Sequence, residues 1–445
     1  MLLEQIIIYS IAFLICAWII HRYLSSIKKK SALTISKIEK AKEEGSFEPI
    51  SLHPFIDLKT CIGSGACVAA CPEKDILGLV NGKASVINAS SCIGHGACFH
   101  ACPVEAITLR IGTESRGVEL PHVNSNYETN VPGIFIAGEL GGMGLIKNSV
   151  EQGIQATKSI YESVKNEKGK DPKIDLVIIG AGPAGIAASL HAKKLGINAV
   201  TLEQDSLGGT VFNFPRSKIV MTAPMELPLH GKVKLYNTSK EELLQLWEQV
   251  ISKNKLDIQE QKKVEEIQHA GDHIFNVQCS DGTQFETKSV LLAIGRRGSP
   301  RKLNIPGEGL SHVAYRLIDE ETIRDKKVLI VGGGDSAIEA ALLLKDQNDV
   351  KLSYRKGNFT RLKRENKEYI LNADKSGALE ILWNTEPKKI TREDVLLFNN
   401  SEELATSFPF DLVYIFAGGE LPTAFLKKSG ITITKRFGYV VKKHK

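Results

Sequence analysis

Six of the eight cysteines in this 445-residue chain lie in two near-copies of one motif. The first copy reads CIGSGACVAACP from Cys61, and the second reads CIGHGACFHACP from Cys92. Cysteine runs of this kind, each ending in Cys-Pro, are typical of iron–sulfur ligands, whose chemistry is the transfer of single electrons. The candidate metal ligands are Cys61, Cys67, Cys71, Cys92, Cys98 and Cys102.

Each run lacks one cysteine of the usual C-x2-C-x2-C-x3-C-P spacing, because Ser64 and His95 occupy the second position. In two-cluster ferredoxins the last cysteine of each run serves the other cluster. The two sets predicted here are therefore Cys61, Cys67 and Cys102, and Cys92, Cys98 and Cys71.

The type of cluster stays open at this point. Three thiolates suit a [3Fe-4S] cluster, whereas a [4Fe-4S] cluster needs a fourth ligand, for which Ser64 and His95 are the candidates. Their alternative roles are those of a turn residue and a hydrogen-bonded loop residue. Zinc is the rival metal, but the Cys-Pro ends and the Gly-Ala residues inside each run favour iron–sulfur clusters.

A first glycine loop, GAGPAG, follows the apolar run DLVIIG and opens an alanine-rich helical stretch. Glycines at this spacing permit a tight turn and a close approach of the backbone to a pyrophosphate at the helix N-terminus. Glu203 ends the next strand, where an acid binds free ribose hydroxyls, as in FAD. The candidate FAD residues are Gly180, Gly182, Pro183, Ala184, Gly185 and Glu203.

A second loop, GGGDSA, again joins an apolar strand to a helix. Its next strand ends in basic residues in place of an acid, which suits a 2′-phosphate and predicts NADPH, with NADH less favoured. The alternative is that these cations are solvated surface residues. The candidate NADPH residues are Gly332, Gly334, Asp335, Ser336 and Ala337 in the loop, with Arg355, Lys356 and Arg361 as phosphate partners.

Three further segments carry a family resemblance over residues 175–435. They are the run LLAIG that ends at Gly295, the run DLVYIFAGGELP from Asp411, and the sequence Gly208-Gly209-Thr210. Together with both loops they resemble the thioredoxin-reductase-like flavoproteins, members of the pyridine nucleotide–disulfide oxidoreductase superfamily with two dinucleotide-binding domains. The resemblance implies that Gly208, Gly209, Thr210 and Gly295 lie near the flavin.

The closing element of that family stands upstream here. The sequence TNVPGIFIAGE ends at Glu139 and precedes a glycine-rich stretch, whereas the chain ends after GYVVKKHK. The order predicts a circular permutation, which compact domains tolerate when their termini lie close together. The resemblance implies that Gly138 and Glu139 contact the flavin, and that the following helix directs its N-terminus at it.

The redox dithiol of thioredoxin reductases is absent, because Cys279 is the only cysteine after Cys102. The chain is therefore similar to the dithiol-free branch, such as ferredoxin–NADP reductases. The resemblance implies that the flavin exchanges electrons directly with iron–sulfur clusters, fused here to the same chain.

The first residues predict a membrane anchor. Residues 6–20 carry no charge, and flanking apolar residues extend the run close to the roughly 20 that a spanning helix needs. Basic residues follow the run and none precedes it, which predicts a single pass through the inner membrane with the remaining domains in the cytoplasm. A cleaved signal peptide is the alternative, but a basic start and a small-residue cleavage site are lacking. The net charge of +6 suits contact with anionic lipid, and no basic stripe indicates nucleic acid.

The predicted fold class is α/β, with two Rossmann-like FAD and NAD(P) domains, a small α+β ferredoxin-like domain and an N-terminal transmembrane helix. The predicted boundaries are 1–24 for the anchor, 25–50 for a linker or short solvated helix, 51–115 for the two-cluster domain, 116–168 for the permuted closing segment, 172–300 for the FAD domain, 301–417 for the NAD(P)H domain, and 418–445 for a return to the FAD domain.

These features predict a membrane-anchored oxidoreductase that passes electrons from NADPH through FAD to the clusters. The acceptor is left open among a quinone, a haem protein, a ferredoxin and a diiron enzyme, and a homodimer is left open as well. No catalytic acid or base is predicted, because the cofactors carry the chemistry. The alternatives are reverse flow from a ferredoxin-type donor to NADP+, and a redox-sensing subunit without steady turnover.

Overall fold

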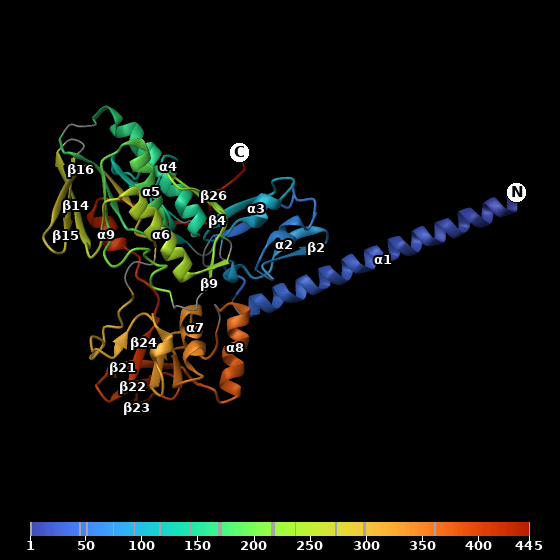
Figure 1. The fold of residues 1–445 in the computed structure, drawn as a ribbon. Helices are drawn as coiled ribbons and strands as arrows, with labels where there is room; N and C mark the ends of the chain where they lie inside the picture. The colour runs from blue at the N-terminus through green and yellow to red at the C-terminus, as the bar shows by residue number, and fades with distance from the viewer. Residues whose placement is uncertain are drawn as a thin grey trace. The chain divides into compact units, whose positions relative to one another are not determined.

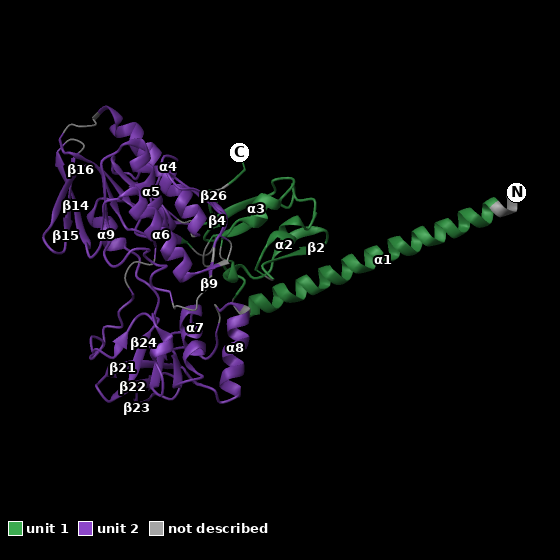
Figure 2. Ribbon diagram, in the orientation of Figure 1, with its two compact units in different colours: residues 1–117, 437–445 green, residues 118–436 purple. Residues whose placement is uncertain are grey.

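The computed structural model describes the chain except residues 1, 44–45, 50–51, 74, 93, 115–116, 142–144, 168–170, 215–218, 236, 272–273, 297–299, 360–361 and 445. The chain forms two compact units (Figure 2). Unit 1 comprises residues 1–117 and 437–445, and unit 2 comprises residues 118–436.

Unit 1 holds the cysteine runs between short strands. Its elements are α1 (Leu2–Glu43), β1 (His53–Ile56), α2 (Ala66–Ala70), β2 (Leu77–Val80), β3 (Lys83–Val86), the 3-10 helix η1 (Ala89–Ser91), α3 (Ala97–Ala101), β4 (Ile107–Ile111) and β26 (Tyr439–Lys442). β2 and β3 form a hairpin, and β1, β4 and β26 form an antiparallel sheet. The two runs repeat one local geometry, because α2 and α3 each begin after a glycine with a left-handed backbone, Gly65 and Gly96.

Helix α1 is continuous from Leu2 to Glu43 and extends well beyond the short helices of its unit (Figure 1). The sequence predicts a linker or a short solvated helix over residues 25–50; the structure instead continues the first helix through this segment as far as Glu43. One side of this segment is not solvated, because Ser31 and Thr34 are buried. Ser31 accepts a hydrogen bond from the backbone N–H of Asn81, in the turn of the β2–β3 hairpin.

Gly78 in β2 permits this close contact. A Cβ atom at position 78 would lie 2.6 Å from the Thr34 methyl group, so only a glycine lets the helix approach the hairpin without displacement. Lys37 adds an ion pair with Asp75. The second half of α1 is therefore a packed part of the cluster-binding unit.

The last residues of the chain also belong to unit 1, which differs in part from the predicted return of residues 418–445 to the FAD domain. β26 pairs with β4, with Tyr439 opposite Ile111, and so covers an edge that β4 would otherwise expose. The ring of His444 stacks on Phe99 at a centroid separation of 3.7 Å. Short exposed strands carry little periodic signal, which is why the sequence did not indicate this pairing.

The first part of unit 2 is built on a sheet in the order β13-β8-β7-β16-β15-β14, with β6 paired to β16. Its elements are β5 (Val118–Pro121), β6 (Ile134–Ile136), η2 (Glu139–Gly141), α4 (Ile146–Val164), η3 (Lys165–Glu167), β7 (Ile174–Ile179), α5 (Pro183–Leu195), β8 (Ala199–Leu202), β9 (Ile219–Met221), β10 (Met225–Leu227), β11 (Gly231–Val233), β12 (Asn237–Ser239), α6 (Lys240–Asn254), β13 (Ile258–Gln259), β14 (Val264–Gly271), β15 (Ile274–Cys279), β16 (Gln284–Leu292), α9 (Thr423–Lys428) and β25 (Ile433–Arg436).

Strand β6 precedes β7 in the chain yet pairs in parallel with β16, with Ile136 opposite Leu292. Helix α4 then packs on α5, and the approach is close at Gly153, where a Cβ would lie 2.2 Å from the Ala184 carbonyl oxygen. Strand β6 and helix α4, which precede β7 in the chain, thus lie within the same sheet and helix layer as the first glycine loop.

The second part of unit 2 is a parallel five-stranded sheet in the order β17-β24-β18-β19-β20, with the three-stranded sheet β21-β22-β23. Its elements are β17 (Val313–Ala314), η4 (Glu320–Thr322), β18 (Lys327–Val331), α7 (Asp335–Leu344), β19 (Asp349–Tyr354), α8 (Arg364–Lys375), β20 (Glu380–Trp383), β21 (Thr385–Ile390), β22 (Asp394–Asn399), β23 (Leu404–Pro409) and β24 (Leu412–Ile415). The buried faces of β18 and α7 form one apolar core, which includes Val328, Ile330 and Ile338.

Candidate iron–sulfur and nucleotide sites

The structure brings Cys61, Cys67 and Cys102 together in unit 1. Burial, followed by the neighbouring charges of Cys102 and Cys61, raises the pKa of the Cys67 thiol. The same three cysteines line one pocket, together with Ser64. Backbone N–H groups point at the sulfurs, from Ala84 to Cys61 at 3.4 Å and from Ala106 to Cys102 at 3.3 Å. These residues therefore form one thiol set, as the crossed pattern predicts.

Cys92, Cys98 and Cys71 form the second set. Burial, with Cys71 as a charged neighbour, raises the pKa of the Cys92 thiol to about 11. Burial, with Cys92 and then Cys71 nearby, raises the pKa of the Cys98 thiol to about 12. Iron binds thiolates, so these buried thiols would release their protons when a cluster binds. The positive charge of the iron would then stabilise the thiolates in place of the water that burial excludes. The donor set fits a cluster in each place.

The two thiol sets are neighbours. The charge of Cys67, from the first set, also raises the pKa of Cys98 in the second. The last cysteine of each run, Cys71 or Cys102, follows its own short helix and reaches the other set. Clusters held by these two sets would therefore be neighbours within unit 1, an arrangement that would suit the exchange of single electrons between them.

The first glycine loop, between β7 and α5, has the geometry of a dinucleotide site. A Cβ at Gly185 would lie 1.8 Å from the Gly180 carbonyl oxygen, so the helix and the turn pack too closely for any side chain. No atom lies within 4 Å of the position of a Cβ at Gly182, which leaves its backbone open to a ligand. Pro183 is the first residue of α5, and Ala184 is buried beside it.

Glu203 lies against this loop. Its carboxylate accepts a hydrogen bond from the Ala181 N–H at 2.7 Å and another from the Asp205 N–H at 3.0 Å. Burial raises the pKa of Glu203. Gly208 donates its N–H to the Ala181 carbonyl oxygen at 3.0 Å, and a Cβ at Gly209 would lie 3.4 Å from the Cα of Gly182. Thr210 follows the pair and is exposed.

The upstream segment reaches the same loop. Gly138 follows β6, and a Cβ there would lie 3.2 Å from the Ala184 Cβ. Gly295 follows β16, at the edge where β6, β7 and β16 all end in parallel. The carboxyl edge of a parallel sheet is where such folds bind nucleotides. The structure thus brings the candidates from both segments to one edge.

Two side chains at this edge escaped the sequence analysis. Gln152 in α4 accepts a hydrogen bond from the Gly138 N–H at 2.8 Å. Arg296 follows Gly295; burial lowers the pKa of Arg296, and the carboxylate of Glu139 opposes that shift. Arg296 could have been predicted as a site residue because it directly follows Gly295. Gln152 could not, because in sequence it looks like any surface residue of a helix.

The second loop connects β18 to α7. A Cβ at Gly332 would lie 2.6 Å from the Phe416 carbonyl oxygen, and one at Gly333 would lie 2.1 Å from the Tyr354 ring. Gly334 and Ser336 are exposed, and Ala337 is buried in the helix. The loop therefore packs tightly at its base and presents its far side to a ligand.

Asp335, the first residue of α7, accepts hydrogen bonds from the Lys363 N–H at 3.0 Å and the Asn366 side chain at 2.8 Å. These bonds hold the start of α8 beside the loop, a role the sequence did not indicate. Arg355 and Lys356 directly follow Tyr354 and are exposed. Arg361 lies outside the described residues.

Two dinucleotide-type loops and two thiol sets define an electron-transfer flavoprotein with an iron–sulfur domain. Residues 177–444 match the family described as pyridine nucleotide-disulphide oxidoreductase, and the chain belongs to that family. Residues 53–103 match the family described as 4Fe-4S dicluster domain. The chain is therefore an NAD(P)H-dependent flavoprotein oxidoreductase fused to a 4Fe-4S ferredoxin domain.

Individual relatives agree with this class. The chain is 26% identical over 265 residues to a ferredoxin–NADP reductase of Ignicoccus hospitalis, covering 58% of this chain and 82% of the relative. It is 25% identical over 271 residues to bacilliredoxin reductase Bdr of Bacillus subtilis, covering 59% and 82%. The solved structure of bacillithiol disulfide reductase Bdr from Bacillus cereus shares the fold, with a TM-score of 0.52 at 23% identity over 60% of this chain and 85% of that one.

Proposed function

We propose that the protein passes electrons from NADPH, through FAD, to its two clusters and then to an acceptor outside the chain. The observation that carries this proposal is the pair of crossed thiol sets in a flavoprotein that has no redox dithiol. After Cys102 the sequence holds only Cys279, which is buried in β15. When bound, a flavin accepts a hydride and can release its electrons one at a time, which matches single-electron clusters.

An anaerobic titration with NADPH tests the proposal. We expect NADPH to bleach the flavin absorbance. The EPR signals of the clusters should then change as well, without any other reductant. Addition of the membrane fraction should then reoxidise both. Failure of NADPH to bleach the flavin would contradict the enzyme assignment, whereas bleaching without any change in the clusters would contradict the proposed route.

The proposal includes a membrane anchor. Helix α1 is long and apolar enough to cross a membrane by length and composition. The protein does not cover the apolar side chains in its first half: Phe13 is 73% exposed and Trp18 is 61% exposed. Such a row of exposed apolar side chains suits lipid, and the basic residues after it favour a cytoplasmic position for the rest of the chain.

NADPH is proposed as the reductant because of Arg355 and Lys356. Tyr354 touches the second glycine loop through Gly333, so the two cations come directly after the residue that meets the loop. Both are exposed and directly follow β19, where the ribose-binding acid of NADH-specific proteins would lie.

We expect the double variant Arg355→Ala/Lys356→Ala to lose NADPH affinity by at least about tenfold, because each charge-assisted bond contributes roughly 1.5–3 kcal/mol. NADH affinity should change little. Stopped-flow measurement of flavin reduction at varied coenzyme concentration would give the dissociation constants for NADPH and for NADH. Lys375→Ala, at the far end of α8, removes one positive charge away from the loop as a control. Equal losses for the two coenzymes would remove the phosphate assignment.

A further inference from the structure

Ser64 and His95 occupy equivalent positions in the two runs and make the same local contact. The Ala66 N–H donates to the Ser64 hydroxyl oxygen at 3.4 Å, and the Ala97 N–H donates to the His95 Nδ1 at 3.3 Å. Each side chain thus accepts a hydrogen bond from the residue two positions later, at the start of α2 or α3. The residue in the place of the usual cysteine thus accepts the backbone N–H of the first residue of the short helix that follows.

For His95 this contact fixes the tautomer. A backbone N–H is always a donor, so Nδ1 must be the unprotonated nitrogen that accepts it. A neutral imidazole then carries its proton on Nε2. If neutral His95 bound iron through Nε2, that nitrogen would need a free lone pair and the proton would lie on Nδ1. The Nδ1–H group would then face the Ala97 N–H, and two donors would be opposed.

The Nε2 atom is buried, and no hydrogen-bond partner for it lies among the described residues of the chain. An unsatisfied buried donor is costly, and such atoms in native proteins nearly always have a partner. Burial lowers the pKa of His95, which keeps the imidazole neutral. The missing acceptor is therefore to be sought in the group that the neighbouring thiols bind.

The surroundings connect His95 to the second thiol set. The charge of Glu73 acts on His95 and also on Cys71 and Cys92. In the first run, the equivalent residue Ser64 lines the pocket formed with Cys61, Cys67 and Cys102. His95 therefore shares a charged neighbour with two members of its set, and the repeated geometry of the runs gives it the position that Ser64 has beside the first set.

We propose that His95 is not an iron ligand but donates a hydrogen bond from Nε2–H to a sulfur of the cluster held by Cys92, Cys98 and Cys71. This inference rests on the proposed function, because it requires that the clusters assemble. A donor to cluster sulfur stabilises the reduced, more negative state and raises the reduction potential. Ser64 is exposed and gives the first cluster no equivalent buried donor, so the two clusters differ in their surroundings.

The test uses the full chain, reconstituted anaerobically with iron and sulfide, in wild-type form and as His95→Gln, His95→Ala and Ser64→Ala. Pulsed EPR of the reduced clusters should show only a weak histidine nitrogen coupling, as for a hydrogen bond to sulfur. His95→Gln should keep the wild-type potential, because its amide can accept from Ala97 and donate to the cluster. His95→Ala should lower the potential of one cluster, and Ser64→Ala should leave that cluster unchanged.

A strong coupling from a nitrogen bound directly to iron would overturn the inference. So would loss of the second cluster in both His95→Gln and His95→Ala, because a glutamine can donate to sulfur but is a poor iron ligand. A cluster that stays bound in His95→Ala at an unchanged potential would overturn it as well, whereas a lowered potential in His95→Ala with a normal one in His95→Gln would support it. Wild-type protein that binds no iron at all would overturn the proposed function itself, an outcome distinct from a cluster with the wrong nitrogen coupling.

Discussion

Replacing Cys61 together with Cys102 by serine should remove one cluster, whereas replacing Cys61 together with Cys71 should remove both. The first pair belongs to one thiol set although its members lie in different runs of the sequence. The second pair belongs to one run but to two sets. In the crossed arrangement the first variant takes two of the three thiolates from one cluster, whereas the second takes one of three from each cluster. Because three thiolates are already one fewer than the usual four, a cluster that loses any of them has too few ligands, and the number of clusters lost reports directly on the crossed arrangement.

Iron and sulfide content per flavin, with EPR of the reduced protein, would measure the outcome. The Cys61/Cys102 variant should keep roughly half of the iron and one unchanged signal. Cys279→Ser is the control, because this buried cysteine lies in β15 of unit 2. NADPH should still bleach the flavin in all three variants. Loss of a single cluster in the Cys61/Cys71 variant would show that each run serves its own cluster.

The cysteine sets and both glycine loops could be predicted because their chemistry constrains residue type and spacing directly. A pyrophosphate loop needs glycines where a Cβ would meet backbone, as at Gly185 and Gly332. The crossed pairing followed from a rule about ferredoxins and required no knowledge of the tertiary structure. These signals are local in sequence, so one sequence alone is enough to recognise them.

The parts that escaped prediction depend on contacts between distant segments. The packing of α1 on the hairpin depends on Gly78, which in sequence looks like an ordinary residue of a short apolar run. The pairing of β26 with β4 joins residues more than 300 positions apart and uses a short, partly exposed strand. The tautomer of His95 depends on a backbone N–H whose direction only the fold sets.

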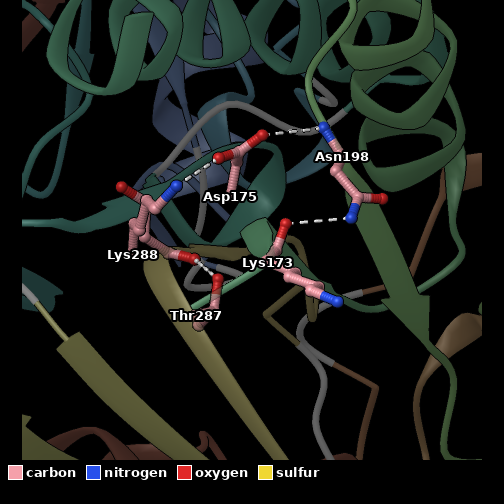
Figure 3. Close-up of polar contacts among 6 residues, drawn as sticks. Lys173, Asp175, Asn198, Thr287 and Lys288 are labelled. Carbon is pink, nitrogen blue, oxygen red and sulfur yellow. Dashed lines mark hydrogen bonds and ion pairs between the residues drawn. The ribbon is translucent and has the colours of Figure 1, made fainter. Parts of the chain in front are cut away.

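A buried ion pair connects two strands of the first sheet of unit 2, near the amino end of β7 and away from the carboxyl edge that carries the first glycine loop. Lys288 in β16 contacts Asp175 in β7 at 2.8 Å, and the two side chains are 7% and 4% exposed (Figure 3). The second carboxylate oxygen of Asp175 accepts the Asn198 N–H at 3.0 Å, just before β8. Asn198 also donates its side-chain amide to the Lys173 carbonyl oxygen. These bonds connect three adjacent strands of the sheet that carries the first glycine loop.

We expect Lys288→Met to destabilise this domain by about 3–5 kcal/mol, because it leaves the Asp175 carboxylate buried without its counter-charge. That loss is a large fraction of the roughly 5–15 kcal/mol by which domains are stable, so flavin content should fall as well. The double variant Asp175→Asn/Lys288→Met should recover most of the loss, since asparagine still accepts from Asn198 and no unpaired charge remains.

Urea unfolding of the detergent-solubilised protein, followed by circular dichroism and flavin release, would compare the midpoints. Lys165→Met breaks the exposed pair with Glu162 and is the matched control, because solvent screens such a pair and its loss should move the midpoint little. A double variant as unstable as Lys288→Met would show that packing around the lysine stem, and not the unpaired carboxylate, determines the stability of this edge of the sheet.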